Sequence, residues 1–312
     1  MSHSPRLPPR LSAVICTYDR YDVLDGAVRA VASQSPPGGM ELLVIDNSPD
    51  AARSAAESAK LNLPGVTWVH EAKPGLSNAR NVGLARAQGE VIAYLDDDAI
   101  AAPGWATAML AAFDGFGPEI AVIGGKVSPL FRSERPAWLS AKMLSQLSMV
   151  DLGNQRRTLA PGEWVVGANI AYRTKALREI GGFSTNLGRI GASGLLSAEE
   201  TDVANRLKTK GFSTGYDPDA SVLHLVDATR TTQSWFARRT AWQAVSAVLS
   251  GEASHDRAAA LNDIRHYFAA LHPADRTAFA LLKDQDNPGD LDWQLGTIYN
   301  LLVLLLAEGR AQ

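Results

Sequence analysis

The segment Glu90-Val-Ile-Ala-Tyr-Leu-Asp-Asp-Asp98 is a short apolar run that ends in three adjacent carboxylates. The length of the run and its β-prone residues indicate a buried strand. Similar runs lie at 11–17, 41–46 and 66–70, and segments with helical spacing of apolar or alanine residues separate them. Because strands that alternate with helices of this length form βαβ units, the sequence predicts an α/β fold with a mixed, mostly parallel sheet flanked by helices.

Polar side chains follow three of the predicted strands. Thr17 and Asp19 follow the first strand, Asp46 ends the second, and the acidic run 96–98 ends the fourth. Ligands of open α/β sheets bind beyond the carboxyl ends of the strands, so we expect these side chains to line one rim. The sequence therefore predicts a binding site at this edge of the sheet.

The acidic run itself favours a bound cation. Adjacent carboxylates repel one another, and a divalent ion relieves that repulsion. Mg²⁺ and Mn²⁺ take oxygen ligands and commonly bridge carboxylates to the phosphates of a substrate. A solvated acidic turn is the alternative for the run taken alone. The polar ends of the neighbouring strands favour the metal site.

The second half of the chain is less regular than the first. Strand-like runs lie at 164–172 and 220–225, and a glycine-rich loop precedes a predicted helix at 199–210. From 233 onward the pattern is helical. The sequence predicts a flexible N-terminus at 1–10, an α/β domain at 11–232 and a helical C-terminal subdomain at 233–312.

Composition excludes several classes of protein. The net charge is −3 and no basic block occurs, so we expect no nucleic-acid partner. The single cysteine, Cys16, excludes an intrachain disulfide and a thiolate metal cluster, and favours a reducing, cytoplasmic location.

Residues 1–10 lack the apolar core of a signal peptide, and the apolar run 301–307 is far shorter than the ~20 residues of a spanning helix. Peripheral membrane contact and a homodimer both stay open.

Five motifs occur in the order found in family 2 glycosyltransferases, and the chain resembles that family over about residues 10–230. The motifs are Thr17 after the first strand, Val44-Ile-Asp-Asn47, Lys73-Pro-Gly-Leu-Ser-Asn-Ala-Arg-Asn-Val-Gly83, Tyr94-Leu-Asp-Asp-Asp98 and Glu199-Glu-Thr-Asp202. The resemblance implies the Rossmann-like GT-A fold. It also implies transfer of a sugar from a nucleotide-diphosphate donor, with inversion at the anomeric carbon and with UDP-sugars favoured.

The resemblance also implies roles for residues near the first two strands and the helix after the third. Thr17 and Asp19 line the nucleotide pocket in this interpretation, and Asp46 accepts hydrogen bonds from the base. Arg80 and Asn81 fall in the donor-binding stretch between the second and fourth strands.

Within the acidic run, the resemblance assigns Asp96 to the ribose and Asp98 to a Mn²⁺ or Mg²⁺ ion that holds the donor diphosphate. Asp97 occupies the variable middle position of the same donor site. His224 ends the last predicted strand, where a family histidine often completes the metal shell, and neutral imidazole suits Mn²⁺. A structural histidine is the alternative.

Glu199 and Glu200 open a predicted helix. The family usually has Glu-Asp here, and its second acid is the general base that deprotonates the acceptor hydroxyl. This chain carries Glu200 in that position, one methylene longer, so Glu200 is the first candidate for the base and Glu199 the second. Acidic residues also suit a helix N-terminus, which is a purely structural explanation of the pair.

Rival functions fit the sequence less well. A sugar-phosphate nucleotidylyltransferase carries a glycine-rich, basic loop after the first strand, and Cys16-Thr-Tyr-Asp-Arg20 has no glycine. A dinucleotide dehydrogenase needs a G-x-G-x-x-G turn, which follows none of the predicted strands. A catalytically inactive sugar-nucleotide-binding protein is a further alternative, and the carboxylates at 96, 98 and 200 argue against it. The resemblance therefore implies an inverting, metal-dependent glycosyltransferase of glycan, polysaccharide or glycoconjugate biosynthesis. Its acceptor is a glycan, a lipid-linked molecule or a small molecule.

Overall fold

A computed structural model describes residues 8–189, 191, 195–251, 253 and 256–310. The described residues fall into two compact units. The first is drawn from Met1–Leu130, Met149–Ser193 and Glu199–Leu225, and the second from Phe131–Ser148, Gly194–Ala198 and Val226–Gln312. The predicted division of the chain at 232 stays a prediction, and the compact units are interleaved along the sequence.

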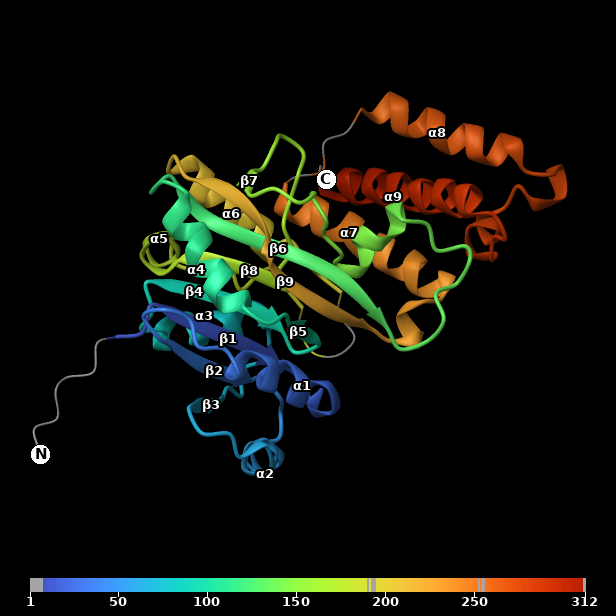
Figure 1. Ribbon diagram of the computed structural model, residues 1–312. Coiled ribbons are helices and arrows are strands. Elements are labelled where there is room, and N and C mark those ends of the chain that lie inside the picture. Colours follow the sequence, from blue (N-terminus) through green and yellow to red (C-terminus); the bar gives the residue numbers. More distant parts are fainter. Residues whose placement is uncertain (1–7, 190, 192–194, 252, 254–255, 311–312) are drawn as a thin grey trace, which may run out of the picture. The chain divides into compact units, whose positions relative to one another are not determined.

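The first unit opens with the parallel strands that the apolar runs predict. They are β1 (Leu11–Thr17), β2 (Met40–Asp46), β3 (Val66–His70) and β4 (Val91–Asp96), which lie side by side in the order β3-β2-β1-β4 (Figure 1). Burial on both faces explains why β1, β2 and β4 read as nearly continuous apolar sequence. The helices α1 (Tyr21–Ala32), α2 (Ala51–Leu61) and α3 (Leu76–Arg86) connect them.

The rest of the sheet contains antiparallel pairs. The strand β8 (Asn169–Arg173) pairs with β4 and with β6 (Ile120–Phe131), and β9 (Ser213–Val226) follows β6. The short strands β5 (Ala99–Ala101) and β7 (Arg157–Thr158) both pair antiparallel with β9. The predicted mixed sheet with flanking helices is confirmed, and the parallel pairs that define it lie in β3-β2-β1-β4.

The core of the first unit fixes β4 and β8, the strands nearest the acidic run. Tyr94, Tyr172 and Phe183 pack edge to face, with ring centroids 5.3–6.1 Å apart. Helices α3, α5 (Thr174–Glu179) and α6 (Glu199–Thr209) contribute to this cluster. Trp105 of α4 (Trp105–Gly115) donates its indole N–H to Asn169 Oδ1 over 2.9 Å, which ties α4 to β8.

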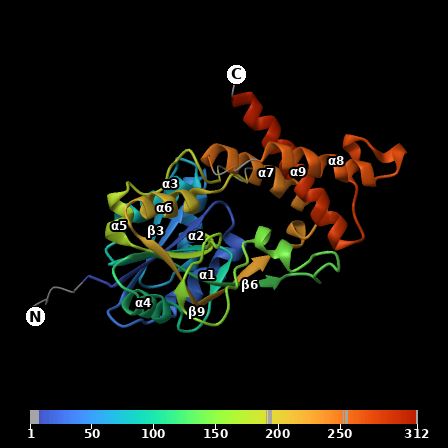
Figure 2. The same ribbon diagram turned by 90° about the horizontal axis from the view of Figure 1, so that it is seen from above.

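The second unit is helical, as predicted for the C-terminal part. It contains α7 (Gln233–Ser250), α8 (Arg257–Ala270) and α9 (Pro288–Arg310), which lie together in both views (Figures 1 and 2). The segments Lys142–Leu147, Pro273–Asp275 and Ala278–Leu282 form short 3₁₀-helices. None of the described helices combines the length and the apolar character needed to cross a bilayer.

Candidate active site

The strand ends meet at one edge of the sheet, as their polar residues predict. Thr17 is the register partner of Asp46 on β2, and Cys16 is the partner of Asp96 on β4. The parallel pairing therefore places the ends of β1, β2 and β4 together. The acidic run continues from this edge into β5.

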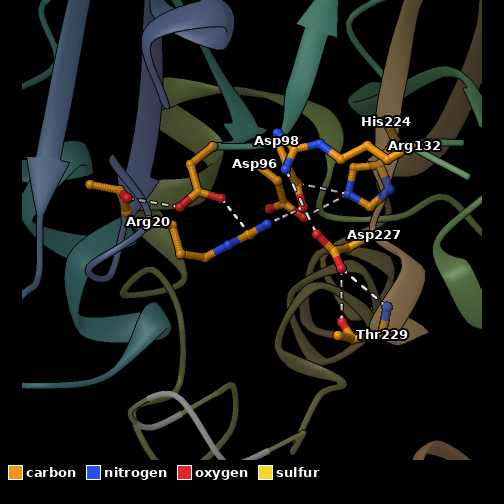
Figure 3. A network of polar contacts seen from close by, with 9 residues as sticks. Arg20, Asp96, Asp98, Arg132, His224, Asp227 and Thr229 are labelled. Atoms are coloured by element: carbon orange, nitrogen blue, oxygen red, sulfur yellow. Dashed lines mark hydrogen bonds and ion pairs between the residues drawn. The ribbon is translucent and has the colours of Figure 1, made fainter. Parts of the chain in front are cut away.

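His224 reaches the acidic run because β5 and β9 pair antiparallel. Ala99 is opposite His224, and the Leu225 N–H donates to the Asp98 carbonyl over 2.9 Å. The side chains meet as a result: His224 Nε2 lies 2.9 Å from Asp98 Oδ1 and 3.8 Å from Asp96 Oδ2 (Figure 3). Asp98 and His224 are both buried, whereas the Asp96 side chain is 30% exposed.

These three residues suit a divalent cation. One ligand atom from each of Asp96, Asp98 and His224 lies within 4.8 Å of the others. Two carboxylate oxygens and an imidazole nitrogen match the preference of Mn²⁺, and Mg²⁺ accepts the same oxygens with water completing its shell. The Nδ1 atom of His224 is buried and has no hydrogen-bond partner among the described residues, so only Nε2 engages the carboxylates. The residues present therefore fit the predicted metal.

Arg20 is a site residue that sequence reasoning missed. It follows β1 and places Nη1 2.6 Å from Asp97 Oδ1 and Nη2 2.7 Å from Asp98 Oδ2 (Figure 3). Burial opposes its charge, but the carboxylates of Asp97 and Asp98 outweigh burial and raise the pKa of Arg20 above its ordinary value. The signal in the sequence is its position: Arg20 is a basic residue that follows directly after Thr17 and Asp19 at the end of the strand.

Asp97 and Thr17 hold the loop after β1 against the acidic run. Thr17 Oγ1 donates to Asp97 Oδ2 over 2.7 Å, and Arg20 occupies the other oxygen. Burial raises the pKa of Asp97 to about 7, and the Arg20 charge acts in the opposite direction. Both oxygens of Asp97 thus have protein partners. The nucleotide contacts of Thr17 and Asp97 stay predictions.

Asp46 lies at the centre of a packed polar cluster. It is fully buried, with Oδ1 accepting from the Ser48 N–H over 3.0 Å and from Ser48 Oγ over 2.5 Å. Tyr21 donates its hydroxyl to Asp46 Oδ2 over 2.9 Å. Asp19, in a left-handed conformation with φ 57°, donates its N–H to Ser48 Oγ and pairs with Arg53 at 2.5 Å. Both oxygens of Asp46 therefore have partners within the protein, and its contact with the nucleotide base stays a prediction.

Arg80 links the acidic run to the residues that open α6. Its side chain is 3% exposed, with Nη1 2.8 Å from Glu199 Oε1 and Nη2 3.8 Å from Asp96 Oδ1. Burial disfavours its charge, but Glu199, Glu200 and Asp96 outweigh burial and raise the pKa of Arg80. A Cβ on Gly167 would lie 2.4 Å from Arg80 Nη2, so a larger residue at 167 would force the guanidinium to shift.

Asn81 points its amide at the protein backbone. Its Nδ2 donates to the Phe183 carbonyl and its Oδ1 accepts from the Phe183 N–H, each over 2.8 Å. These two bonds fix the loop that carries Phe183 onto α3. The predicted contact of Asn81 with the donor stays a prediction.

Two adjacent carboxyl groups at the start of α6 keep unsatisfied oxygens. Glu199 Oε2 and Glu200 Oε2 are buried without a hydrogen-bond partner among the described residues. Burial, together with the charge of Glu200, raises the pKa of Glu199 to about 7 against the opposing charge of Arg80. Glu200 Oε1 accepts only a long bond of 3.4 Å from the Gly167 N–H. Buried carboxylate oxygens of this kind need a hydrogen-bond donor, and the hydroxyl of a bound substrate can provide one.

Comparisons with known proteins identify the family to which the chain is similar. The family model described as Glycosyl transferase family 2 matches residues 12–181. A glucosyl-dolichyl phosphate glucuronosyltransferase from Haloferax volcanii is 27% identical over 263 residues, which cover 82% of this chain and 83% of that protein.

Solved structures resemble the chain in fold. A mannosyltransferase from Pyrobaculum calidifontis, in complex with GDP-Man and Mn²⁺, has a TM-score of 0.55 and 20% identity over 97% of this chain and 80% of its own. GalNAc-T7 with UDP, GalNAc and Mn²⁺ also has a TM-score of 0.55, with 16% identity over 89% of this chain and 53% of its own.

Proposed function

The chain belongs to glycosyl transferase family 2, and we propose that it is an inverting, metal-dependent member that transfers a sugar to an acceptor hydroxyl. The predicted GT-A fold and glycosyltransferase class are confirmed by the family match and the structural neighbours. The observation that carries the proposal is the cluster of Asp96, Asp98 and His224, joined through Arg80 to Glu199 and the start of α6.

Asp98 and His224 are proposed to hold the cation, with Asp96 toward the ribose of the donor. A divalent ion bound there supplies Lewis-acid stabilisation for the departing diphosphate. Arg80 keeps Asp96 in place because its guanidinium is buried and contacts that carboxylate at 3.8 Å. The neighbours solved with GDP-Man and Mn²⁺ and with UDP, GalNAc and Mn²⁺ support this class of donor. UDP-sugars are the favoured donors.

Glu200 is proposed as the general base that takes the proton of the acceptor hydroxyl at Oε2. The raised pKa of Glu199 taken alone favours Glu199. However, Arg80 holds Oε1 of Glu199 at 2.8 Å, so this carboxylate is already engaged in an ion pair with the protein. Glu200 has only the weak contact to the Gly167 N–H and keeps a buried oxygen for the substrate.

A lipid-linked molecule is the proposed acceptor. The named substrate of the Haloferax volcanii relative is a glucosyl-dolichyl phosphate, and the aligned region covers 82% of this chain. Parallel assays of transfer to prenyl-phosphate sugars, free oligosaccharides and simple glycosides distinguish a lipid-linked acceptor from a glycan and from a small molecule. The reaction belongs to glycoconjugate or polysaccharide biosynthesis in this proposal.

Turnover of nucleotide sugars by the wild type and two variants tests the proposed base. We expect Mn²⁺-dependent release of nucleoside diphosphate by the wild type. Glu200→Gln keeps the shape of the side chain and is expected to retain donor binding while losing at least about 10²-fold in kcat. Glu199→Gln is the matched comparison and is expected to lose less. Retained transfer in Glu200→Gln would refute the base assignment.

A further inference from the structure

Arg20 already supplies positive charge to the carboxylates at the proposed metal site. The side chains of Asp97 and Asp98 are 5% and 2% exposed, whereas that of Arg20 is 43% exposed. Charges in such positions are costly to bury unless an opposite charge lies next to them. The guanidinium at 2.6 and 2.7 Å meets this need for both carboxylates.

A divalent ion at Asp98 has to compete with this guanidinium. One oxygen of Asp98 contacts Arg20 and the other contacts His224. A cation bound to Asp98 and His224 would therefore stand beside a guanidinium on the same carboxylate. Like charges a few ångströms apart repel strongly near a protein surface, and the double charge of the metal increases the repulsion.

We propose that Arg20 is a resident cation that the metal replaces at Asp98, and that the displaced guanidinium then binds the donor diphosphate. This inference rests on the proposed function. Arg20 follows β1 in the segment before α1, and its side chain is long and nearly half exposed, so it can move without unpacking the core. A guanidinium also pairs with phosphate oxygens through two parallel hydrogen bonds. Arg20 thus acts as a positioning residue that couples arrival of the metal to binding of the donor.

The first test is a titration of the protein with Mn²⁺ in the absence of nucleotide. The electron paramagnetic resonance signal of free Mn²⁺ measures how much of the ion is unbound. Removing the competing charge in Arg20→Ala is expected to tighten Mn²⁺ binding by about tenfold. Arg53→Ala is the matched control, because Arg53 is exposed and pairs with Asp19 at 2.5 Å rather than with the acidic run. Weaker or unchanged Mn²⁺ binding by Arg20→Ala would overturn the inference.

The second test measures UDP binding by calorimetry at saturating Mn²⁺. Arg20→Ala is expected to bind UDP about tenfold more weakly than the wild type, because the guanidinium is missing from the diphosphate. Arg20→Lys keeps the positive charge but lacks the planar guanidinium, so its UDP affinity should lie between those of the wild type and Arg20→Ala. The same variant replaces Arg20→Ala if that protein does not fold. Unchanged UDP affinity in both variants refutes the diphosphate contact.

The two measurements separate this inference from the proposed function. A wild type that binds neither Mn²⁺ nor UDP contradicts both. A wild type that binds both, with an Arg20→Ala variant that does not bind Mn²⁺ more tightly and UDP more weakly, contradicts only the exchange of Arg20 for the metal.

Discussion

Neutralising Glu199 should destabilise the fold far more than neutralising Glu200. Glu199→Gln leaves the Arg80 guanidinium, 3% exposed, without its partner at 2.8 Å. Removing one member of a buried ion pair costs about 3–5 kcal/mol. Asp96 remains 3.8 Å from Arg80, and relief of the burial and Glu200 repulsion that raise the pKa of Glu199 offsets part of the cost, so no more than the lower end, about 3 kcal/mol, is expected. Glu200→Gln removes only a 3.4 Å contact with the Gly167 N–H and should cost under about 1 kcal/mol.

Thermal unfolding by circular dichroism measures this difference. At about 2–4 °C per kcal/mol for a unit of this size, Glu199→Gln should lower Tm by about 6–12 °C and Glu200→Gln by under about 4 °C. The double variant Arg80→Met/Glu199→Leu removes both charges and should recover much of the loss. Equal Tm values for the two single variants, with turnover lost in Glu199→Gln, would refute both the buried pair and the choice of Glu200 as base.

Three further outcomes follow from the contacts of the site. Gly167→Ala places a Cβ 2.4 Å from Arg80 Nη2 and should cost about 2 kcal/mol of unfolding free energy, measured by urea denaturation. Asn81→Ala breaks both hydrogen bonds to Phe183, so it should lower Tm and leave UDP affinity unchanged. Weaker UDP binding at an unchanged Tm would instead favour a contact of Asn81 with the donor. The pKa of Asp97 is raised to about 7, so the folded state binds more protons than the unfolded state between about pH 4 and 7. Stability should fall as pH rises through this window and fall less in Asp97→Asn, as urea midpoints across pH will show.

The parts of the fold that depend on local pattern could be predicted from the sequence. The strands at 11–17, 41–46, 66–70 and 91–96 are short apolar runs with helical segments between them, and each lies close to its expected place. Their polar ends meet because parallel strands bring their carboxyl ends to one edge.

The strand at Ile120–Phe131 and the helix at Trp105–Gly115 could not be predicted in the same way. The strand contains Gly124, Gly125 and Pro129, which weaken a strand pattern, and it is held by antiparallel partners distant in the sequence. The helix buries residues on much of its surface, so it lacks a clear polar face that would mark it.

The charge pairs of the site were beyond sequence reasoning for a different reason. Arg20 meets Asp97 and Asp98, and Arg80 meets Glu199, only because the sheet brings separate segments together. The family motifs identify the carboxylates, but the spacing of residues in the sequence does not predict which arginine pairs with which carboxylate. The same limit applies to Asn81, whose amide is engaged by the backbone of Phe183.

Calorimetry of UDP and GDP binding, in Mn²⁺ and in EDTA, tests the proposed metal site when the wild type is compared with Asp98→Asn. The proposed metal site predicts that the wild type binds a nucleoside diphosphate in Mn²⁺ and loses that binding in EDTA. It also predicts that Asp98→Asn does not bind in either condition, because Asp98 is the buried ligand that contacts His224 at 2.9 Å. Equal nucleotide binding by both proteins with and without the metal would contradict a metal site at Asp98.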